Sequence, residues 1–294
     1  MFLSHVNDIQ KNQYIVLKQY ENKKILINSN NFRIVSNICP HQKSLISVKD
    51  GYGSRVCPYH AWSFDINGTP INSGTTKCKN NKNLDTNSVY EWNNLLFSTK
   101  VSCIELDFLN LSNLTLMEKR IDFVQTNLSN VMDLFLDVDH IPFLHKGVYD
   151  KIGLSKINSV DWHFYEDGSL QLVKNEFDKK TKFYQTILEE DKNSKYNAAW
   201  FALYPSTMIE WQPGALFITI TLTKNEVLVY KYRDIRYSFL NWKINESVWE
   251  TAWLQDKKQA ELISEINDEN LEPSKRHFRN FLKKNEYFLP FFNY

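Results

Sequence analysis

The sequence predicts an α+β protein in which an all-β N-terminal domain precedes a domain that combines an antiparallel sheet with helices. The chain has 294 residues, which is enough for two average domains. Its first part alternates short β-rich runs with turns, and helical periodicity begins only after about residue 105. We therefore expect one domain over residues 1–105 and a second over residues 106–294.

Short runs rich in β-branched and aromatic residues predict the strands of the first domain. These runs are YIVL (14–17), KILIN (24–28), FRIVSNI (32–38) and AWSFDI (61–66). Asn67-Gly68 follows the last run and is typical of a hairpin turn. The polar stretch 73–88 predicts a loop.

The second domain should consist of a helix, a run of strands and two further helices. Residues 126–141 predict a helix that Pro142 should stop. Further helices are expected over 247–266, where Ser247 and Glu250 have the spacing of a capping box, and over 274–284. Between them, turn residues separate strand-like runs: VDWHFY, LQLVKNEF, KFYQTIL, AAWFALYP, TMIEW, ALFITITLT and EVLVYKYR.

Composition argues against several classes of protein. Thirty-five basic and 34 acidic side chains give no excess positive charge for nucleic-acid binding. No apolar run approaches the roughly 20 residues that span a bilayer. The N-terminus MFLSHVNDIQKNQY lacks a basic start and an apolar core, so we expect no secretion signal. Four cysteines are too few for a disulfide scaffold, which favours the reducing cytoplasm; Cys78 and Cys103 have no partner pattern.

Two short clusters in the first domain combine cysteine with histidine. They are Cys39-Pro-His41 and Cys57-Pro-Tyr-His60. Zinc fingers usually pair Cys with Cys and His with His, whereas each cluster here supplies one of each. This arrangement suits a two-iron cluster in which one iron takes both thiolates and the other takes both imidazoles. A zinc clip and chance are the alternatives.

The stretch NVMDLFLDVDHIPFLH indicates a second metal site. His140 and His145 lie five residues apart, and Pro142 between them should break the helix and let His145 turn back toward His140. Asp133, Asp137 and His140 have the spacing i, i+4, i+7, which places them on one stripe of a helix. The alternative is that this polar stripe faces water.

A third ligand is expected from the helix over 247–266. Asp256 falls inside its apolar stripe, and a lone buried carboxylate is costly unless it is paired or bound to metal. The alternative is a solvent-facing Asp256 paired with Lys257 or Lys258. Asp234 and Glu250 are weaker candidates for the same role. The stripe consists of Trp249, Ala252, Trp253, Ala260 and Ile263.

The first motif, C-P-H-x15-C-P-Y-H followed by A-W-S-F-D-x-N-G, resembles that of the Rieske non-heme iron oxygenases. The second, D-x-x-H-x-x-x-x-H, is similar to the catalytic-domain motif of the same family. The resemblance covers both motifs and the domain order. It implies an N-terminal all-β Rieske [2Fe-2S] domain followed by a helix-grip (START-like) antiparallel-sheet domain with a mononuclear iron.

The resemblance also implies a role for each matching residue. Cys39 and Cys57 would bind one iron of the cluster, and His41 and His60 the other. Mononuclear Fe(II) would be held by His140, His145 and, by its place in a late helix, Asp256. Asp137 would be the carboxylate that links the two metal centres. Many relatives have Asn or Glu where this chain has Asp133, so the role of Asp133 stays open.

The implied activity is hydroxylation, dealkylation or ring dihydroxylation of a small organic substrate with O2. No G-x-G-x-x-G or flavin motif occurs, so the electrons should come from NAD(P)H through a separate reductase or ferredoxin. The family resemblance further implies a head-to-tail homotrimer. The alternative is an electron-transfer protein whose C-terminal domain only binds a ligand or a partner.

Residues 198–219 should line the substrate cavity. Their aromatic side chains suit stacking on an aromatic ring or a cation–π cage for a methylated or quaternary amine, with Glu210 as the counter-charge. An ordinary aromatic-rich core sheet explains the same residues. The candidate substrate contacts are Trp200, Tyr204, Met208, Glu210 and Trp211.

Overall fold

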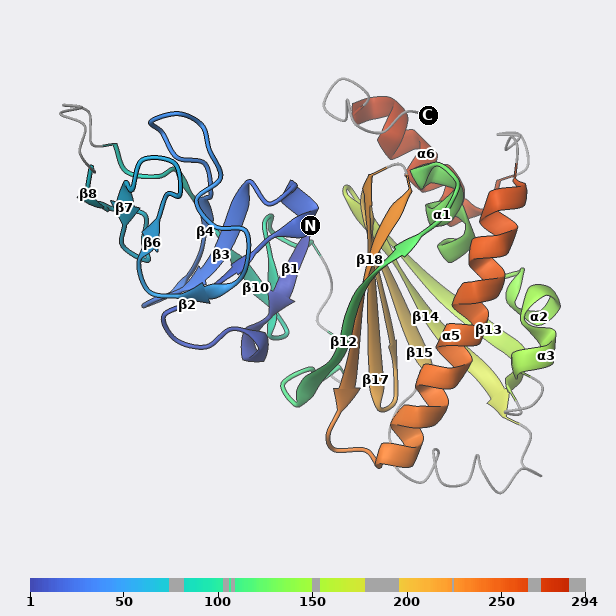
Figure 1. Ribbon diagram of the computed structural model, residues 1–294. Helices are drawn as coiled ribbons and strands as arrows, with labels where there is room; N and C mark the ends of the chain where they lie inside the picture. The colour runs from blue at the N-terminus through green and yellow to red at the C-terminus, as the bar shows by residue number, and fades with distance from the viewer. Residues whose placement is uncertain are drawn as a thin grey trace. The chain divides into compact units, whose positions relative to one another are not determined.

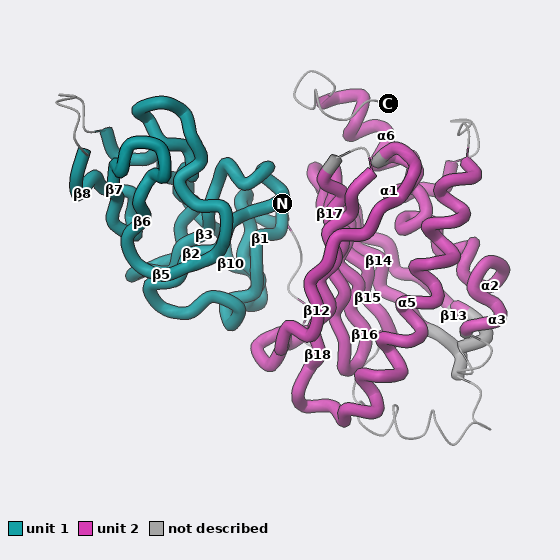
Figure 2. The backbone as a smooth tube through the Cα atoms, viewed as in Figure 1, with its two compact units in different colours: residues 1–101 teal, residues 102–294 magenta. Residues whose placement is uncertain are grey.

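The chain divides into two compact units, residues 1–101 (unit 1) and 102–294 (unit 2), which are coloured separately in Figure 2. The predicted division after residue 105 lies close to this point. The structure is a computed structural model. It describes residues 1–73, 82–102, 106, 109–149, 154–177, 196–223, 225–263 and 271–285.

Unit 1 is all β in its described part, apart from two single turns of 3-10 helix, Val6–Asp8 and Lys18–Tyr20. One sheet has the order β1 (Phe2–His5), β11 (Leu95–Phe97), β10 (Tyr90–Trp92). The next has the order β5 (Gly51–Tyr52), β2 (Gln13–Val16), β3 (Lys24–Asn28), β4 (Phe32–Ser36), β9 (Thr86–Ser88). The third joins β6 (Arg55–Val56), β7 (Ser63–Phe64) and β8 (Pro70–Asn72). The predicted turn at Asn67-Gly68 is confirmed, because Gly68 has φ of 87° and joins β7 to β8.

Unit 2 is built on a seven-stranded antiparallel sheet. Six strands follow one another as a meander, and the first strand of the unit pairs with the last. The predicted run KFYQTIL lies outside the described residues. In order across the sheet the strands are β12 (Leu114–Phe123), β18 (Glu226–Asp234), β17 (Ala215–Thr223), β16 (Thr207–Gln212), β15 (Ala198–Leu203), β14 (Gly168–Phe177) and β13 (Leu154–Tyr165).

The long helix α5 (Phe239–Leu262) lies across one face of this sheet, over β17 and β18 (Figure 1). Trp242, Trp249 and Trp253 of α5 pack with Phe217 and Val229 of the sheet. Helix α1 (Leu128–Phe135) contacts α5 on this face, and α6 (Pro273–Asn285) packs its Phe278 and Leu282 in a separate apolar cluster. None of the helices in the described ranges combines the length and apolar character needed to cross a bilayer.

The helix predicted over 126–141 ends at Phe135, and that prediction is wrong in its second half. The carboxylate of Asp137 accepts hydrogen bonds from the backbone N–H groups of Asp139 (3.0 Å) and His140 (3.1 Å), a local turn that competes with helix. Pro142 is not a stop signal. It occupies the first turn of α2 (Ile141–Leu144), where a proline is tolerated because its missing N–H needs no partner; α3 (Lys146–Tyr149) follows.

The predicted start of the late helix at Ser247 is also wrong. Helix α5 begins at Phe239, and its N-cap is Ser238, whose side chain accepts the N–H of Asn241 (3.1 Å). Ser247 therefore lies inside the helix, and Glu250 pairs with two basic side chains of the sheet instead of capping the backbone.

Strand β12 was not expected from the sequence, because its alternating residues are charged. Glu118, Arg120 and Asp122 are two residues apart and so share one face of the strand. All three take part in ion pairs with each other or with residues of β18 and α5. The sequence did carry a strand pattern here, an alternation with a period of two residues, but the alternating residues were charged instead of apolar.

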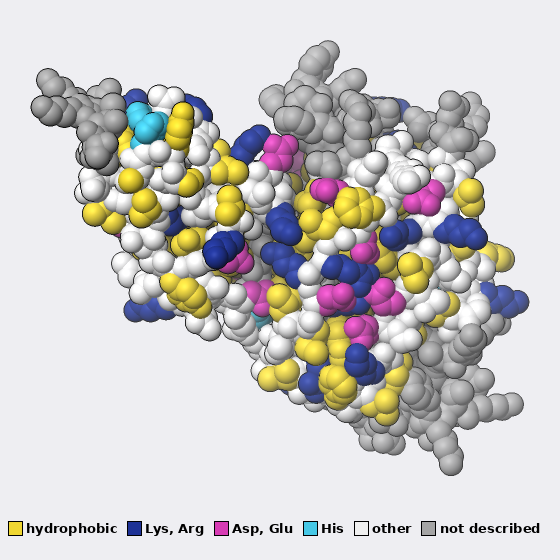
Figure 3. Space-filling view, viewed as in Figure 1, with side chains coloured by type: hydrophobic (Ala, Val, Ile, Leu, Met, Phe, Trp, Pro, Cys, Tyr) yellow, Lys and Arg dark blue, Asp and Glu magenta, His cyan; other side chains and the backbone are white. Residues whose placement is uncertain are grey.

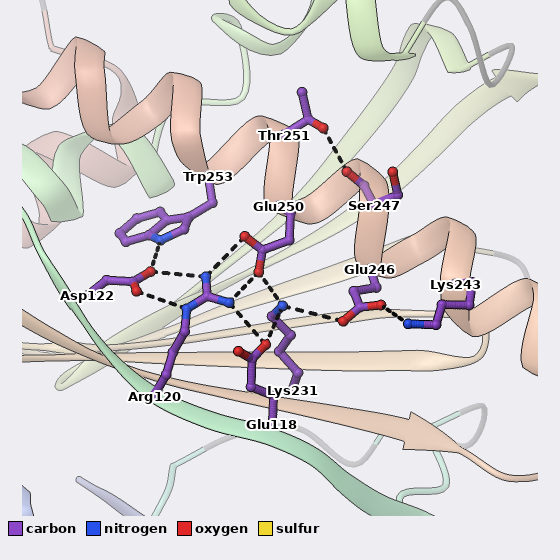
Figure 4. Close-up of polar contacts among 10 residues, drawn as sticks. All are labelled: Glu118, Arg120, Asp122, Lys231, Lys243, Glu246, Ser247, Glu250, Thr251 and Trp253. Atoms are coloured by element: carbon purple, nitrogen blue, oxygen red, sulfur yellow. Dashed lines mark hydrogen bonds and ion pairs between the residues drawn. The ribbon is translucent and has the colours of Figure 1, made fainter.

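These charges form a network that fastens α5 to the edge of the sheet (Figure 4). Lys231 of β18, 2% exposed, pairs with Glu250 and with Glu118 (2.6 Å). Arg120 also pairs with Glu250 and with Asp122 (2.8 Å). The indole N–H of Trp253 donates to Asp122 (2.6 Å). On the drawn face of unit 2, basic and acidic side chains are interspersed rather than gathered by sign (Figure 3).

Acid should weaken this network. Burial acts to raise the pKa of both Asp122 and Glu118. Hydrogen bonds from Arg120 and Trp253 lower the pKa of Asp122 overall, and hydrogen bonds from Lys231 and Arg120 lower that of Glu118. The network's stabilisation is therefore complete above the unfolded-state pKa values of about 4 and is lost as pH falls through the lower folded values. We expect the free energy of unfolding, from urea titrations at pH 7 and pH 3.5, to fall less in Asp122→Asn than in the wild type. An equal fall in both proteins would contradict the assignment.

Candidate functional site

The two cysteine loops of unit 1 have the same backbone turn. The carbonyl of Cys39 accepts a hydrogen bond from the N–H of Lys43 (2.9 Å), and that of Cys57 accepts one from Ala61 (3.0 Å). Lys43 and Ala61 both have φ of 57°, in the left-handed region. Each loop therefore closes directly after its cysteine and histidine, one between β4 and β5 and the other between β6 and β7.

The side chains of these loops form a pair of thiols and a pair of imidazoles. Cys39 and Cys57 are each 2% exposed, and burial together with the adjacent Cys57 raises the pKa of the Cys39 thiol. The rings of His41 and His60 lie 4.6 Å apart, and the Nδ1 atoms of both are buried without a hydrogen-bond partner. His41 is held by stacking on Trp62, with 4.9 Å between ring centroids. Unpaired buried nitrogens beside two thiols fit a cluster with two thiolate and two imidazole ligands.

A second donor set lies in unit 2, where His140, His145 and Asp256 come together. The Nε2 atoms of the two histidines are 3.1 Å apart, and Oδ1 of Asp256 lies 3.4 Å from His140 and 3.1 Å from His145. A metal that binds three donors at about 2.1 Å and about 90° to one another requires edges of about 3.0 Å. The triangle therefore has the size of one face of an octahedral metal site.

Two helices, α2 and α5, position these donors. His140 and His145 flank α2, and Asp256 projects from α5. Oε1 of Gln255 accepts a hydrogen bond from Nδ1 of His145 (2.8 Å), which orients that ring as outer partners of metal-binding histidines do. No sequence pattern pointed to Gln255 beyond its position next to Asp256.

Asp256 is 9% exposed and faces the histidines, so the alternative of a solvent-facing Asp256 is wrong. Burial acts to raise the pKa of Asp256, but the two histidines lower it overall; Asp256 in turn raises the pKa of His145 against the effect of burial. The two rival carboxylates are engaged elsewhere. Asp234 pairs with Arg236, and Glu250 pairs with Arg120 and Lys231.

Asp137 lies beside the triangle but outside it. Its Oδ1 is 3.9 Å from Nδ1 of His140, and its Oδ2 accepts from Lys275 of α6 (2.6 Å). Burial acts to raise the pKa of Asp137, but hydrogen bonds from Glu272 and Lys275 lower it overall. Burial and Asp137 together raise the pKa of Glu272 to about 8. The sequence did not predict Glu272, just before α6, or Lys275 of α6 as partners of Asp137, because no local pattern joins residues so distant in the chain.

Asp133 and Asp137 do not share a helical stripe with His140, because α1 ends before Asp137. Asp133 is buried and pairs with Arg279 of α6. The structure therefore shows Asp133 as an ion-pair partner of α6.

A cavity opens beside the donor triangle. Trp200, Met208, Glu210 and Trp211 line it, as expected, but Tyr204 does not. Tyr204 packs on Phe278 and Phe281 of α6 (5.0 and 5.2 Å between centroids), so its expected substrate contact is wrong. The lining also includes residues that sequence reasoning did not assign to it, among them Phe135, Phe217, Trp249 and Trp253.

Comparison with known proteins agrees with this geometry. Residues 1–89 match the Rieske [2Fe-2S] domain family. The chain contains a Rieske domain. It is 24% identical to a putrescine 2-hydroxylase from Ralstonia nicotianae over 68% of the chain. It is 22% identical to a carnitine monooxygenase oxygenase subunit from Acinetobacter baumannii over 74% of the chain. The matches span 58% and 63% of those relatives, so the chain covers about three fifths of their length.

Solved structures extend the likeness beyond the Rieske domain. A quaternary ammonium Rieske monooxygenase in complex with L-carnitine matches 100% of this chain and 88% of its own, with a TM-score of 0.68 at 13% identity. Naphthalene 1,2-dioxygenase with indole bound matches 91% of this chain and 75% of its own, with a TM-score of 0.65 at 15% identity. These matches confirm the predicted fold and the resemblance to Rieske oxygenase alpha subunits. A Rieske domain implies a [2Fe-2S] cluster.

Proposed function

We propose that this protein is the oxygenase component of a Rieske-type non-heme iron oxygenase. It would use O2, and electrons from a separate NAD(P)H-dependent reductase or ferredoxin, to hydroxylate, dealkylate or dihydroxylate a small organic substrate. The observation that carries the proposal is the triangle of His140, His145 and Asp256, which has metal-site dimensions and opens onto a cavity. An electron carrier alone has no need of a second donor set beside a cavity.

Each donor set would hold one group. Cys39, Cys57, His41 and His60 would hold the [2Fe-2S] cluster, and the triangle would hold the mononuclear Fe(II). When bound, the cluster supplies single electrons, and a ferrous ion held on one face by two histidines and a carboxylate keeps positions open for O2 and substrate.

The surrounding residues would keep this site in shape. Gln255 fixes the ring of His145, so that its Nε2 stays turned toward Asp256. The carboxylate of Asp137 accepts a hydrogen bond from the backbone N–H of His140 and a second one from the side chain of Lys275. Aromatic side chains form part of the cavity wall beside the donors, among them Trp200, Trp211 and Phe217.

Asp137 is also the residue through which we propose that the two centres communicate. A homotrimer would bring His41 or His60 of one chain near Asp137 of the next. One solved relative, a quaternary ammonium Rieske monooxygenase, is described with inter-subunit electron transfer, which supports this arrangement. We further propose that the protein works in the cytoplasm, since four cysteines are too few for a disulfide scaffold.

Metal analysis of the purified protein tests the proposal. We expect about three irons and about two acid-labile sulfides per chain, two irons from the cluster and one from the triangle. Single turnover of the reduced protein under 18O2, with aromatic acids and with methylated amines, should then place label in a product. Two irons and no labelled product would identify an electron carrier instead. A colourless protein that holds zinc would identify a zinc-stabilised binding module.

A further inference from the structure

Arg55 is a cation enclosed in the core of unit 1. It is 2% exposed and belongs to β6, which leads directly into the Cys57 loop. A buried charge is costly unless a group of opposite charge lies near it. Burial lowers the pKa of Arg55 to about 10, which leaves the guanidinium charged at neutral pH.

The contacts of Arg55 do not neutralise it. Only Nη2 finds acceptors, the backbone carbonyls of Asp65 (3.2 Å) and Ile66 (3.4 Å), whereas Nε and Nη1 have no hydrogen-bond partner among the described residues. The guanidinium also lies 5.6 Å from the ring centroid of Tyr14, an uncharged partner. The carboxylate of Asp65 acts on Arg55 through its charge without a hydrogen bond, and it accepts from the backbone N–H of Thr69 instead (2.7 Å).

Arg55 and Cys57 lie on the same side of one strand. They are two residues apart, and the pairing of β6 with β7 continues at Cys57, whose N–H donates to the carbonyl of Trp62 (2.7 Å). Phe64, the cross-strand partner of Arg55, packs in the buried apolar cluster that contains Cys39 and Cys57. In extended backbone the Cα atoms of Arg55 and Cys57 are about 6.6 Å apart, so the guanidinium lies roughly 10–12 Å from a metal bound at Cys57.

The cluster that a Rieske domain implies becomes an anion when it is reduced. The charges of two ferric ions, two sulfides, two thiolates and two neutral imidazoles cancel in the oxidised cluster, and one added electron leaves one negative charge. A fixed cation therefore interacts more strongly with the reduced state than with the oxidised state. At an effective dielectric constant of about 20, a unit charge at roughly 10–12 Å changes a one-electron equilibrium about tenfold.

We infer that Arg55 is a built-in counter-charge for the reduced cluster, which it stabilises and whose reduction potential it raises. The electron comes from the proposed reductase or ferredoxin, and Arg55 exchanges no proton and forms no bond in the step. Arg55 thereby sets how readily the cluster accepts each electron and how strong a reductant the cluster then is. The inference rests on the cluster of unit 1 and is independent of the donor triangle in unit 2.

Redox titration of the cluster in the full chain at pH 7, followed by its EPR signal, tests the inference. Arg55→Met removes the charge and keeps an unbranched apolar stem, and Arg55→Gln removes the charge but keeps an amide donor. We expect the ratio of reduced to oxidised cluster at a fixed potential to fall about tenfold in both variants, which is about 59 mV for one electron.

Arg33→Met is the matched control. Arg33 is an exposed arginine of β4 in the same unit, so water and salt screen its charge. Its loss should change the ratio of reduced to oxidised cluster by less than about twofold.

The outcomes separate a role of charge from a structural role. An unchanged ratio in Arg55→Met and Arg55→Gln would overturn the inference. A fall confined to Arg55→Met would also overturn it, because the lost hydrogen bonds would then be responsible, and so would an equal fall in Arg33→Met. A protein that holds zinc and no cluster would overturn the inference together with the proposed function. The expected shift in a protein whose triangle holds no iron would support the inference and reject the oxygenase.

Discussion

His140→Ala should lower the iron content from about three to about two per chain and abolish substrate oxidation, while the visible and EPR spectra of the cluster persist. The triangle then keeps only His145 and Asp256, whose donor atoms are 3.1 Å apart. Loss of an outer partner of a metal ligand already costs about 10–100-fold in affinity, so loss of a ligand should cost more than ~100-fold. Iron analysis and single-turnover product yield measure both effects.

His163→Ala is the matched control for this variant. His163 lies on β13, in the same unit but outside the donor triangle and the cavity. It should keep three irons and full single-turnover yield. A His140→Ala protein that still oxidises substrate would show that the triangle is not the catalytic centre.

Lys231→Met should be among the most destabilising single changes in unit 2. Lys231 is almost completely buried, and its removal leaves the carboxylates of Glu118 and Glu250 with Arg120 as their remaining partner. Breaking a fully buried ion pair from one side costs about 3–5 kcal/mol; because Glu118 and Glu250 are 36% and 28% exposed, we expect a cost of about 3 kcal/mol here. In a domain of this size that corresponds to a fall in Tm on the order of 10 °C. Differential scanning calorimetry of the purified proteins measures the shift.

Lys243→Met makes the same chemical change at the edge of the same network. The side chain of Lys243 is 53% exposed and forms an ion pair with Glu246 (2.9 Å). Exposed pairs of this kind contribute up to about 1 kcal/mol, so the Tm should move by a few degrees at most. Equal shifts in the two variants would mean that the buried network does not hold α5.

The metal-binding motifs were the most predictable part of the molecule, because each is contained in a few consecutive residues. A Cys and a His separated by one or two residues must lie in one turn, and His140 and His145 can approach across a single short helix. Asp256 was predicted from a different signal, a carboxylate inside an apolar helical stripe. The structure brings His140, His145 and Asp256 together in one group, and in unit 1 it places His41 against His60 and Cys39 against Cys57.

What the sequence did not predict depends on contacts between distant segments. Strand β12 was missed because the face that it turns toward α5 is charged. The charged residues of β12 find their partners in Lys231 of β18 and Glu250 of α5, which are distant in the sequence. The start of α5 was predicted eight residues too late, because Ser247 and Glu250 have the spacing of a capping box although they lie inside the helix. Tyr204 was assigned to the cavity because it belongs to the right strand pair, but α6 covers it instead.

The donor triangle draws its atoms from both ends of unit 2, since His140 and His145 precede the meander and Asp256 follows it. Before the sheet has formed and α5 has docked, nothing holds these atoms within reach of one ion. If the triangle holds the proposed ferrous ion, occupancy and folding of this unit would be linked equilibria: free ferrous ion would favour the docked helix by mass action, and a chelator would withdraw that support. Iron supply during synthesis would then affect how much native protein accumulates, as well as how active each molecule is.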